Sequence, residues 1–154
     1  MATSNGKAVT VKTTFSRETS VSNIIQTDAS IVWALLTNAN DMARWNSTLV
    51  SVEGDIKLGN TIKLVSKLDP KRTFKLKVKE LMPEKRLVWG DSQGSRVYTL
   101  MNNGDGSMSF WMVEKIGGLL FPLFAKMIPP FDASFEQFAA DLKKESELIY
   151  ASKK

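Results

Sequence analysis

The chain has 154 residues, of which 43% are hydrophobic and 24% charged, and its formal net charge is +5. These values are typical of one soluble globular domain and exclude an intrinsically disordered chain. Cysteine and histidine are both absent, which excludes disulfides, thiolate or imidazole metal sites, and catalysis by either side chain. We therefore expect no metal and no cofactor, and an enzyme with this sequence would have to use Asp, Glu, Tyr, Lys or Arg.

The N-terminal residues 1–14 are mostly small and polar and lack the apolar core of a signal peptide. No segment approaches the ~20 apolar residues of a membrane span. We therefore expect a flexible tail over 1–14, a single domain over 15–154 and a cytoplasmic location. Val9 and Val11 alternate with polar residues, so this stretch can also extend the first strand.

A strand over 15–27 is followed by two short helical segments. Asp28 is a helix N-cap residue, and apolar residues follow it at helical spacing, which predicts a helix over 29–36. A second cap-like cluster at 38–41 precedes Met42 and Trp45, which indicates another short helix.

Six further strands are predicted over 49–54, 62–68, 72–81, 86–89, 96–101 and 108–114. In the third of these, apolar residues from Phe74 to Val78 alternate with lysines from Lys75 to Lys79, as in a half-buried antiparallel strand. No aromatic residue lies among these lysines on their own face of the strand, so we expect no nucleic-acid binding.

A long helix begins at Phe131 or Asp132, after Pro129-Pro130, and runs almost to the C-terminus. Its apolar residues recur at spacings of three, four or seven and share one face. These residues either pack plainly in a core or form one wall of a cavity beneath a strongly curved sheet.

Two carboxylates are tentative acid/base candidates. Glu80 lies an even number of residues after Phe74 and Val78, and Glu114 lies an even number after Phe110. In a regular strand each glutamate would therefore point to the same face as those residues. The last strand carries bulky residues on both faces, so its parity does not identify the inner one. Glu114 and Glu80 therefore either face the cavity, where the pair could act as acid and base on a substrate, or reach solvent at the strand ends.

The segment 117–130 is apolar, with Lys126 as its single charged residue. It is a buried connector with a helical turn, a mobile lid with glycine and proline hinges, or a site of transient membrane contact.

The order and spacing of several short motifs resemble the START-like (SRPBCC) superfamily, in particular its polyketide cyclase/dehydrase and lipid-transport branch, which shares its fold with birch-pollen-allergen-like proteins. The motifs are Asp28-Ala29-Ser30 with Trp33, Leu36-Thr37-Asn38, Trp45, Val52-Glu53-Gly54 with Gly59, Val78 and Glu80 with Pro83, Gly104 with Gly106, Glu114-Lys115-Ile116-Gly117, and Leu142-Lys143. The resemblance implies an α+β helix-grip fold: a curved seven-stranded antiparallel sheet wrapped around a long C-terminal helix, with two short helices after the first strand.

The resemblance also implies a cavity between the sheet and the helix. We expect it to bind a small hydrophobic or amphipathic molecule that is lipid-like or polyketide-like. The residues expected to line it are Trp45, Leu64, Leu76, Trp89, Phe110, Met112, Phe131, Phe135 and Phe138. The alternatives are a cyclase or dehydratase that uses the same cavity and a co-chaperone-like interaction module. The sequence encodes no clear oligomeric interface, and no catalytic residue of the family transfers to it.

Overall fold

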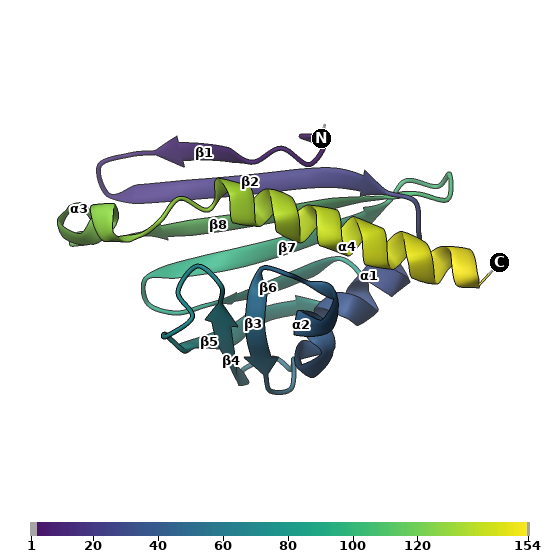
Figure 1. Ribbon diagram of the computed structural model, residues 1–154, viewed down its shortest axis with the longest axis horizontal. Helices are drawn as coiled ribbons and strands as arrows, with labels where there is room; N and C mark the ends of the chain where they lie inside the picture. Colours follow the sequence, from purple (N-terminus) through teal and green to yellow (C-terminus); the bar gives the residue numbers. More distant parts are fainter. Residues whose placement is uncertain (1–2, 154) are drawn as a thin grey trace.

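One antiparallel sheet of eight strands dominates the structure, and a long C-terminal helix lies across it (Figure 1). The computed structural model describes residues 3–153. Along the sheet the strands follow the order β1-β2-β8-β7-β6-β5-β4-β3. Successive strands from β3 to β8 are therefore neighbours in the sheet, and β8 also pairs with β2. The strands are β1 (Val9–Lys12), β2 (Ser16–Ile25), β3 (Leu49–Glu53), β4 (Thr61–Ser66), β5 (Phe74–Met82), β6 (Arg86–Gly90), β7 (Gly94–Asn102) and β8 (Met108–Gly117).

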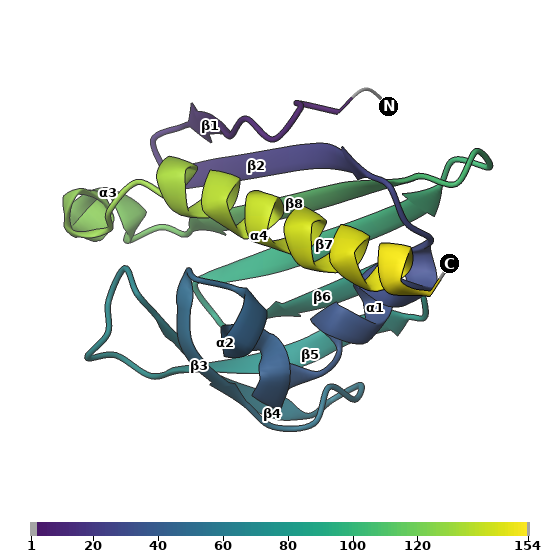
Figure 2. The ribbon, with the colours of Figure 1, turned by 45° about the vertical axis from the view of Figure 1, so that its right-hand side comes forward.

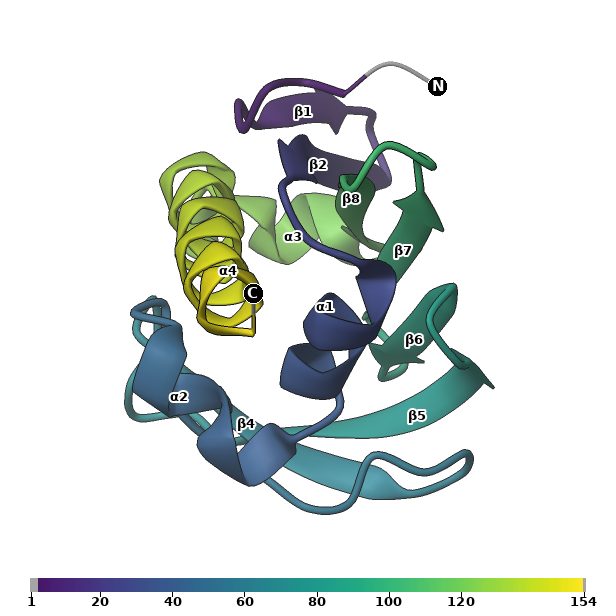
Figure 3. The ribbon, with the colours of Figure 1, turned by 90° about the vertical axis from the view of Figure 1, so that its right-hand side faces the viewer.

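Two short helices and the long C-terminal helix lie on the concave side of the curved sheet, and a further short helix lies at one end of it (Figures 2 and 3). They are α1 (Ala29–Leu36), the 3₁₀ turn η1 (Ala39–Asp41), α2 (Met42–Trp45), α3 (Phe121–Phe124), the 3₁₀ turn η2 (Ala125–Met127) and α4 (Asp132–Ser152). The predicted N-cap of α1 is confirmed, since the Asp28 side chain accepts a hydrogen bond from the Ser30 amide. Figure 3 looks along α4 and shows the sheet curving around it, which confirms the expected helix-grip arrangement.

The structure has one strand more than the seven expected. This strand, β1, lies inside the segment predicted to be a tail and pairs with β2. Two side-chain contacts also hold this segment to α4. The Thr10 hydroxyl donates to Asp132 at 2.6 Å, and the Ala8 amide donates to Glu136 at 2.9 Å. The sheet therefore extends to residue 9, while residues 1 and 2 of the predicted tail lie outside the described part of the chain.

A β-bulge interrupts the alternation of β5. Val78 pairs with Trp89 and Glu80 pairs with Val88, which leaves Lys79 as an extra residue on β5. A bulge of this kind reverses the side-chain parity beyond it. Leu81 therefore faces the core opposite the buried Leu87, and Glu80 lies on the outer face of the sheet.

Candidate functional site

The inner face of the last strand is the face that carries Phe110 and Met112. Both side chains are completely buried in the core. Alternation along β8 then places Glu114 on the concave face as well. On the neighbouring strand Tyr98 pairs with Met112, and Arg96 pairs with Glu114. The two strands thus bring a hydrophobic pair and a charged pair side by side on the same face.

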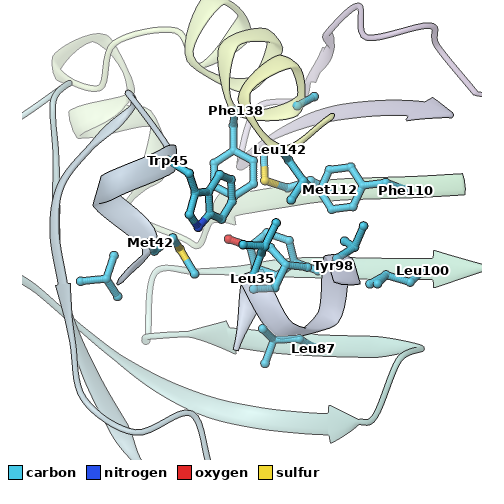
Figure 4. Close-up of a cluster of buried hydrophobic side chains, with 14 of the residues drawn as sticks. Leu35, Met42, Trp45, Leu87, Tyr98, Leu100, Phe110, Met112, Phe138 and Leu142 are labelled. Atoms are coloured by element: carbon cyan, nitrogen blue, oxygen red, sulfur yellow. The ribbon is translucent and has the colours of Figure 1, made fainter. Parts of the chain in front are cut away.

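A packed aromatic cluster fills the space beneath α1 and α2 (Figure 4). The ring of Phe138 on α4 lies 5.9 Å from Trp45, 5.9 Å from Tyr98 and 6.5 Å from Phe110, measured between centroids. Met112 is buried in the same cluster. Four of the residues predicted to line the cavity, Trp45, Phe110, Met112 and Phe138, therefore lie in closely packed core and outside the apolar pocket between the sheet and the start of α4.

This apolar pocket lies at the other end of the concave face, where α4 begins. Its volume is about 190 Å³. The predicted residues that line it are Leu64, Leu76, Trp89, Phe131 and Phe135. Phe131 and Phe135 stack with their ring centroids 6.0 Å apart, so α4 contributes a flat aromatic wall opposite the aliphatic side chains of β4 and β5.

An ion pair lies in this otherwise largely apolar pocket. The Arg96 Nε donates to the Glu114 Oε1 at 2.7 Å, and the two side chains are 18% and 19% exposed. The Arg96 guanidinium also lies 4.9 Å from the centroid of the Phe135 ring, within cation–π distance. Burial opposes the charged form of Arg96, but the neighbouring Glu114 charge keeps the pKa of Arg96 above its usual value.

Behind the ion pair, Tyr98 marks the boundary between the pocket and the packed cluster. Burial raises the pKa of its hydroxyl, and the nearby positive charge of Arg96 partly opposes that rise. The hydroxyl lies close enough to the Arg96 side chain to interact with it, but it forms no well-aligned hydrogen bond with any residue that the structure describes. Its ring lies 5.2 Å from that of Trp89, which lines the pocket.

Glu80 does not belong to this pocket. It pairs with Arg86 at 3.0 Å on the outer face of the sheet, and both side chains are about two-fifths exposed. The hypothetical Glu80–Glu114 pair is therefore wrong, because the bulge at Lys79 turns Glu80 away from the concave face. Glu114 lines the pocket, but its carboxylate already forms an ion pair with Arg96.

Sequence reasoning missed Arg96. The sequence could have indicated it, because Arg96 lies two and four residues before Tyr98 and Leu100 on β7 and so shares their face. Both of these residues are buried in the core. A charged residue in line with two core residues indicates an inward-facing charge. The partner could not be found in the same way, because the register between β7 and β8 is set by the fold.

The segment between β8 and α4 forms the short turns α3 and η2 and contributes Met127 to the pocket wall. Gly118 begins it with a φ of +141°, a conformation that favours glycine. At its far end, the buried Arg17 donates to the carbonyl oxygens of Ile128 and Pro129, at 3.2 and 2.8 Å. The predicted helical turn is present, but its leucines are exposed.

No three or more carboxylates, histidines or cysteines within residues 3–153 gather in a way that could hold a metal ion. Within the same residues, no helix is both long and apolar enough to cross a bilayer.

A curved antiparallel sheet closed by a long C-terminal helix, with a pocket between them, defines a START-like helix-grip protein. Residues 26–118 match the family described as activator of Hsp90 ATPase homolog 1-like protein. The chain belongs to this family within the START-like superfamily. No curated protein matches the sequence significantly.

Solved structures with the same fold have little sequence in common with this chain. A conserved protein of unknown function from Enterococcus faecalis, EF2215, superposes with a TM-score of 0.66 at 14% identity, covering 97% of this chain and 92% of its own. A START superfamily protein from Mycobacterium smegmatis has a TM-score of 0.63 at 11% identity, with coverages of 86% and 98%. DynU16, a protein of the dynemicin biosynthetic locus, has a TM-score of 0.62 at 16% identity, covering 86% of this chain and 48% of its own. Identities this low establish the fold alone.

Proposed function

We propose that this protein binds a small, neutral, amphipathic molecule in the pocket between the sheet and the start of α4. The observation that carries the proposal is one pocket that combines apolar walls with an inward-facing ion pair. Aromatic and aliphatic side chains such as Phe135 and Leu64 would hold the apolar part of the ligand. The Arg96–Glu114 pair would hold its polar group.

The size of the pocket favours a ligand no larger than one substituted ring or a short acyl chain. Pockets for drug-sized ligands usually have volumes of about 300–1,000 Å³, and the pocket here has about 190 Å³. A cavity of ~150 Å³ is already large enough for benzene. A long lipid or a multi-ring polyketide would have to extend beyond the pocket, so the proposed ligand is smaller than the lipid-like or polyketide-like molecule expected from sequence.

The ion pair favours a neutral polar group that can both donate and accept hydrogen bonds. Arg96 and Glu114 already balance each other's charge, so an anionic ligand would compete with Glu114 and leave an uncompensated charge in a low-dielectric site. A hydroxyl accepts from a guanidinium and donates to a carboxylate without adding charge. Phenols and small alcohols fit this requirement.

Three matched probes test the polar selectivity: 4-propylphenol, propylbenzene and 4-propylbenzoate, titrated by protein-observed NMR or calorimetry. We expect 4-propylphenol to bind about tenfold more tightly than propylbenzene, because a hydrogen bond to a charged group contributes roughly 1.5 kcal/mol or more. The benzoate should bind most weakly. An equal affinity for all three, or no binding by any, would contradict the proposal.

Two leucines on β5 provide a matched pair of variants. Leu76 lines the pocket, whereas Leu81 faces the core elsewhere, and both are partly buried. Leu76→Trp should fill the pocket and weaken 4-propylphenol binding at least tenfold, while Leu81→Trp should leave the affinity unchanged. Thermal unfolding of both variants checks that each one folds. Loss of binding by both, or by Leu81→Trp alone, would place the ligand elsewhere.

The natural ligand can be sought by native and denaturing mass spectrometry of the protein purified from its own host. A molecule present in the native spectrum and lost on denaturation would give the ligand mass. The proposal expects a small neutral compound.

A cyclase- or dehydratase-type reaction is a second candidate, and the position of Glu114 in the pocket favours it. Of the two glutamates considered from the sequence, only Glu114 could act there as an acid or base, because Glu80 lies on the outer face. Glu114 is also engaged by Arg96. Binding requires no proton transfer by this pair, so binding is the function that the geometry supports best.

A further inference from the structure

The segment 118–127, here called the tip, exposes a cluster of large apolar side chains. Leu119 is 86% exposed, Leu120 65%, Leu123 80% and Met127 78%. Phe121, in contrast, is buried within the same segment. The tip is therefore amphipathic, with one aromatic side chain turned inward and its aliphatic side chains turned toward water.

Both ends of the tip are anchored to the rest of the domain. The Gly118 amide donates to the Phe15 carbonyl at 2.9 Å. Beyond the other end, Arg17 holds the carbonyls of Ile128 and Pro129. The exposed leucines therefore lie on a segment whose two ends are both hydrogen-bonded to the rest of the domain. Clusters of exposed apolar residues usually mark an interaction surface.

Basic residues outnumber acidic ones near these leucines. The sequence 115–131 contains Lys115 and Lys126 and no acidic residue. The β1–β2 turn and the β4–β5 turn lie at the same end of the molecule as α3 (Figures 1 and 2). The basic residues there are Lys12 at the end of β1 and Lys67, Lys71 and Arg72 before β5, against the acidic residues Asp69 and Asp91, which line the pocket at this end.

The pocket opens beside the tip. Met127 and Pro129 line it from one side, and Leu68 and Arg72, both exposed, line it from the β4–β5 turn. Any surface that covers the tip would therefore face the mouth of the pocket. A small amphipathic molecule dissolved in that surface would have a short path into the protein.

We propose that the tip docks the protein on an anionic lipid bilayer. Leu119, Leu120 and Leu123 insert among the headgroups, and the surrounding lysines pair with anionic lipids. Charge complementarity favours this occupant over a second copy of the chain, because two tips with the same basic surroundings repel each other on a protein of net charge +5. The surface deepens the proposed function by giving the ligand a source, but docking itself does not depend on the ligand.

Flotation with phosphatidylcholine vesicles, with and without phosphatidylglycerol, tests the proposal directly. We expect binding to the anionic vesicles, weaker binding to the neutral ones, and loss of binding as salt is added. The Leu119→Ser/Leu123→Ser variant should lose at least tenfold in affinity. Lys126→Gln should lose about fivefold on anionic vesicles alone.

Exposed residues away from the tip supply the controls. Leu58 and Leu148 are 67% and 59% exposed, so Leu58→Ser/Leu148→Ser removes similar side chains and should bind vesicles as the unaltered protein does. Lys144→Gln, on α4, is the matched charge control. Equal losses in the tip and control variants, or no binding to anionic vesicles, would overturn the proposal.

Two further measurements separate the alternatives. If the unaltered protein sediments as a dimer that Leu119→Ser/Leu123→Ser dissociates, the tip is a self-association surface and membrane docking is overturned. Leu76→Trp, which blocks the pocket, should bind vesicles normally. Failure of ligand binding and failure of docking are therefore distinguishable.

Discussion

The concave face of the sheet contains two regions that share the same strands and the same helix but differ in packing. Beneath α1 and α2, the rings of Trp45, Tyr98 and Phe138 fill the space between sheet and helix. At the start of α4, a pocket of about 190 Å³ remains between similar walls. The closed region stabilises the fold, and the open region is the candidate ligand site.

One step along two paired strands separates these regions. Tyr98 pairs with Met112 on the packed side, and Arg96 pairs with Glu114 on the open side. The hydrophobic pair can be enclosed completely, whereas full enclosure of the charged pair would cost several kcal/mol per ion. The packed side also receives Trp45 from α2. The change of residue type along β7 and β8 thus coincides with the boundary between the packed and the open region.

The largest expected difference between the regions comes from truncating one phenylalanine in each. Phe138→Ala should lower the free energy of unfolding by about 3–5 kcal/mol, because it leaves a cavity in packed core. Phe131→Ala should cost about 1–2 kcal/mol, because that ring is partly exposed beside the pocket. Urea denaturation measures both. Similar losses would mean that the two regions are packed alike.

The ion pair gives a smaller effect. Glu114→Gln leaves Arg96 without its carboxylate, which should cost about 1–3 kcal/mol, less than for a fully buried pair because the pocket is partly solvated. Arg96→Leu/Glu114→Leu removes both charges and should cost less than Glu114→Gln. It should also abolish the preference for 4-propylphenol over propylbenzene. If Arg96→Leu/Glu114→Leu loses as much stability as Arg96→Leu and Glu114→Leu lose together as single variants, the two groups act independently.

Tyr98→Phe should have the smallest effect at neutral pH. The hydroxyl lies beside the Arg96 side chain but forms no well-aligned hydrogen bond among the described residues, so its removal should change the free energy of unfolding by less than about 1 kcal/mol. Urea denaturation at neutral pH measures this change. A clear loss of stability would mean that the hydroxyl has a partner in solution.

The same variant should alter the stability at alkaline pH. Burial raises the pKa of Tyr98 in the folded state above its ordinary value of 10.0. The unfolded chain therefore releases this proton first, and stability present below pH 10.0 is lost as the pH rises from 10.0 through the folded-state pKa. Tyr98→Phe should remove that part of the loss. An identical alkaline decline in both proteins would assign it to other groups.

Local patterns were sufficient for most of the secondary structure. The Asp28 cap and the spacing from Ile31 to Leu36 predicted α1 with its observed bounds, and Pro129-Pro130 placed the start of α4 within one residue. These features depend on residues close together in sequence, whose side-chain spacing follows directly from helix geometry. The alternation from Phe74 to Val78 likewise predicted the inner face of β5.

The site could be predicted only in part. Apolar residues at regular spacing, such as Leu64, Leu76 and Phe135, line the pocket, and their binding of a ligand stays a prediction. Phe110 and Phe138 follow the same patterns but lie in packed core. Periodicity identifies an inward-facing side chain and gives no information on whether other residues fill the space in front of it.

The sequence by itself determined the order of the elements, the faces of most strands and the absence of histidine and cysteine chemistry. Only the tertiary structure decided that Lys79 forms a bulge that turns Glu80 outward, that Arg96 meets Glu114, and that the tip lies beside the pocket. The physical reason is that the first group depends on composition and local spacing, whereas the second depends on strand register and on packing between segments far apart in the chain.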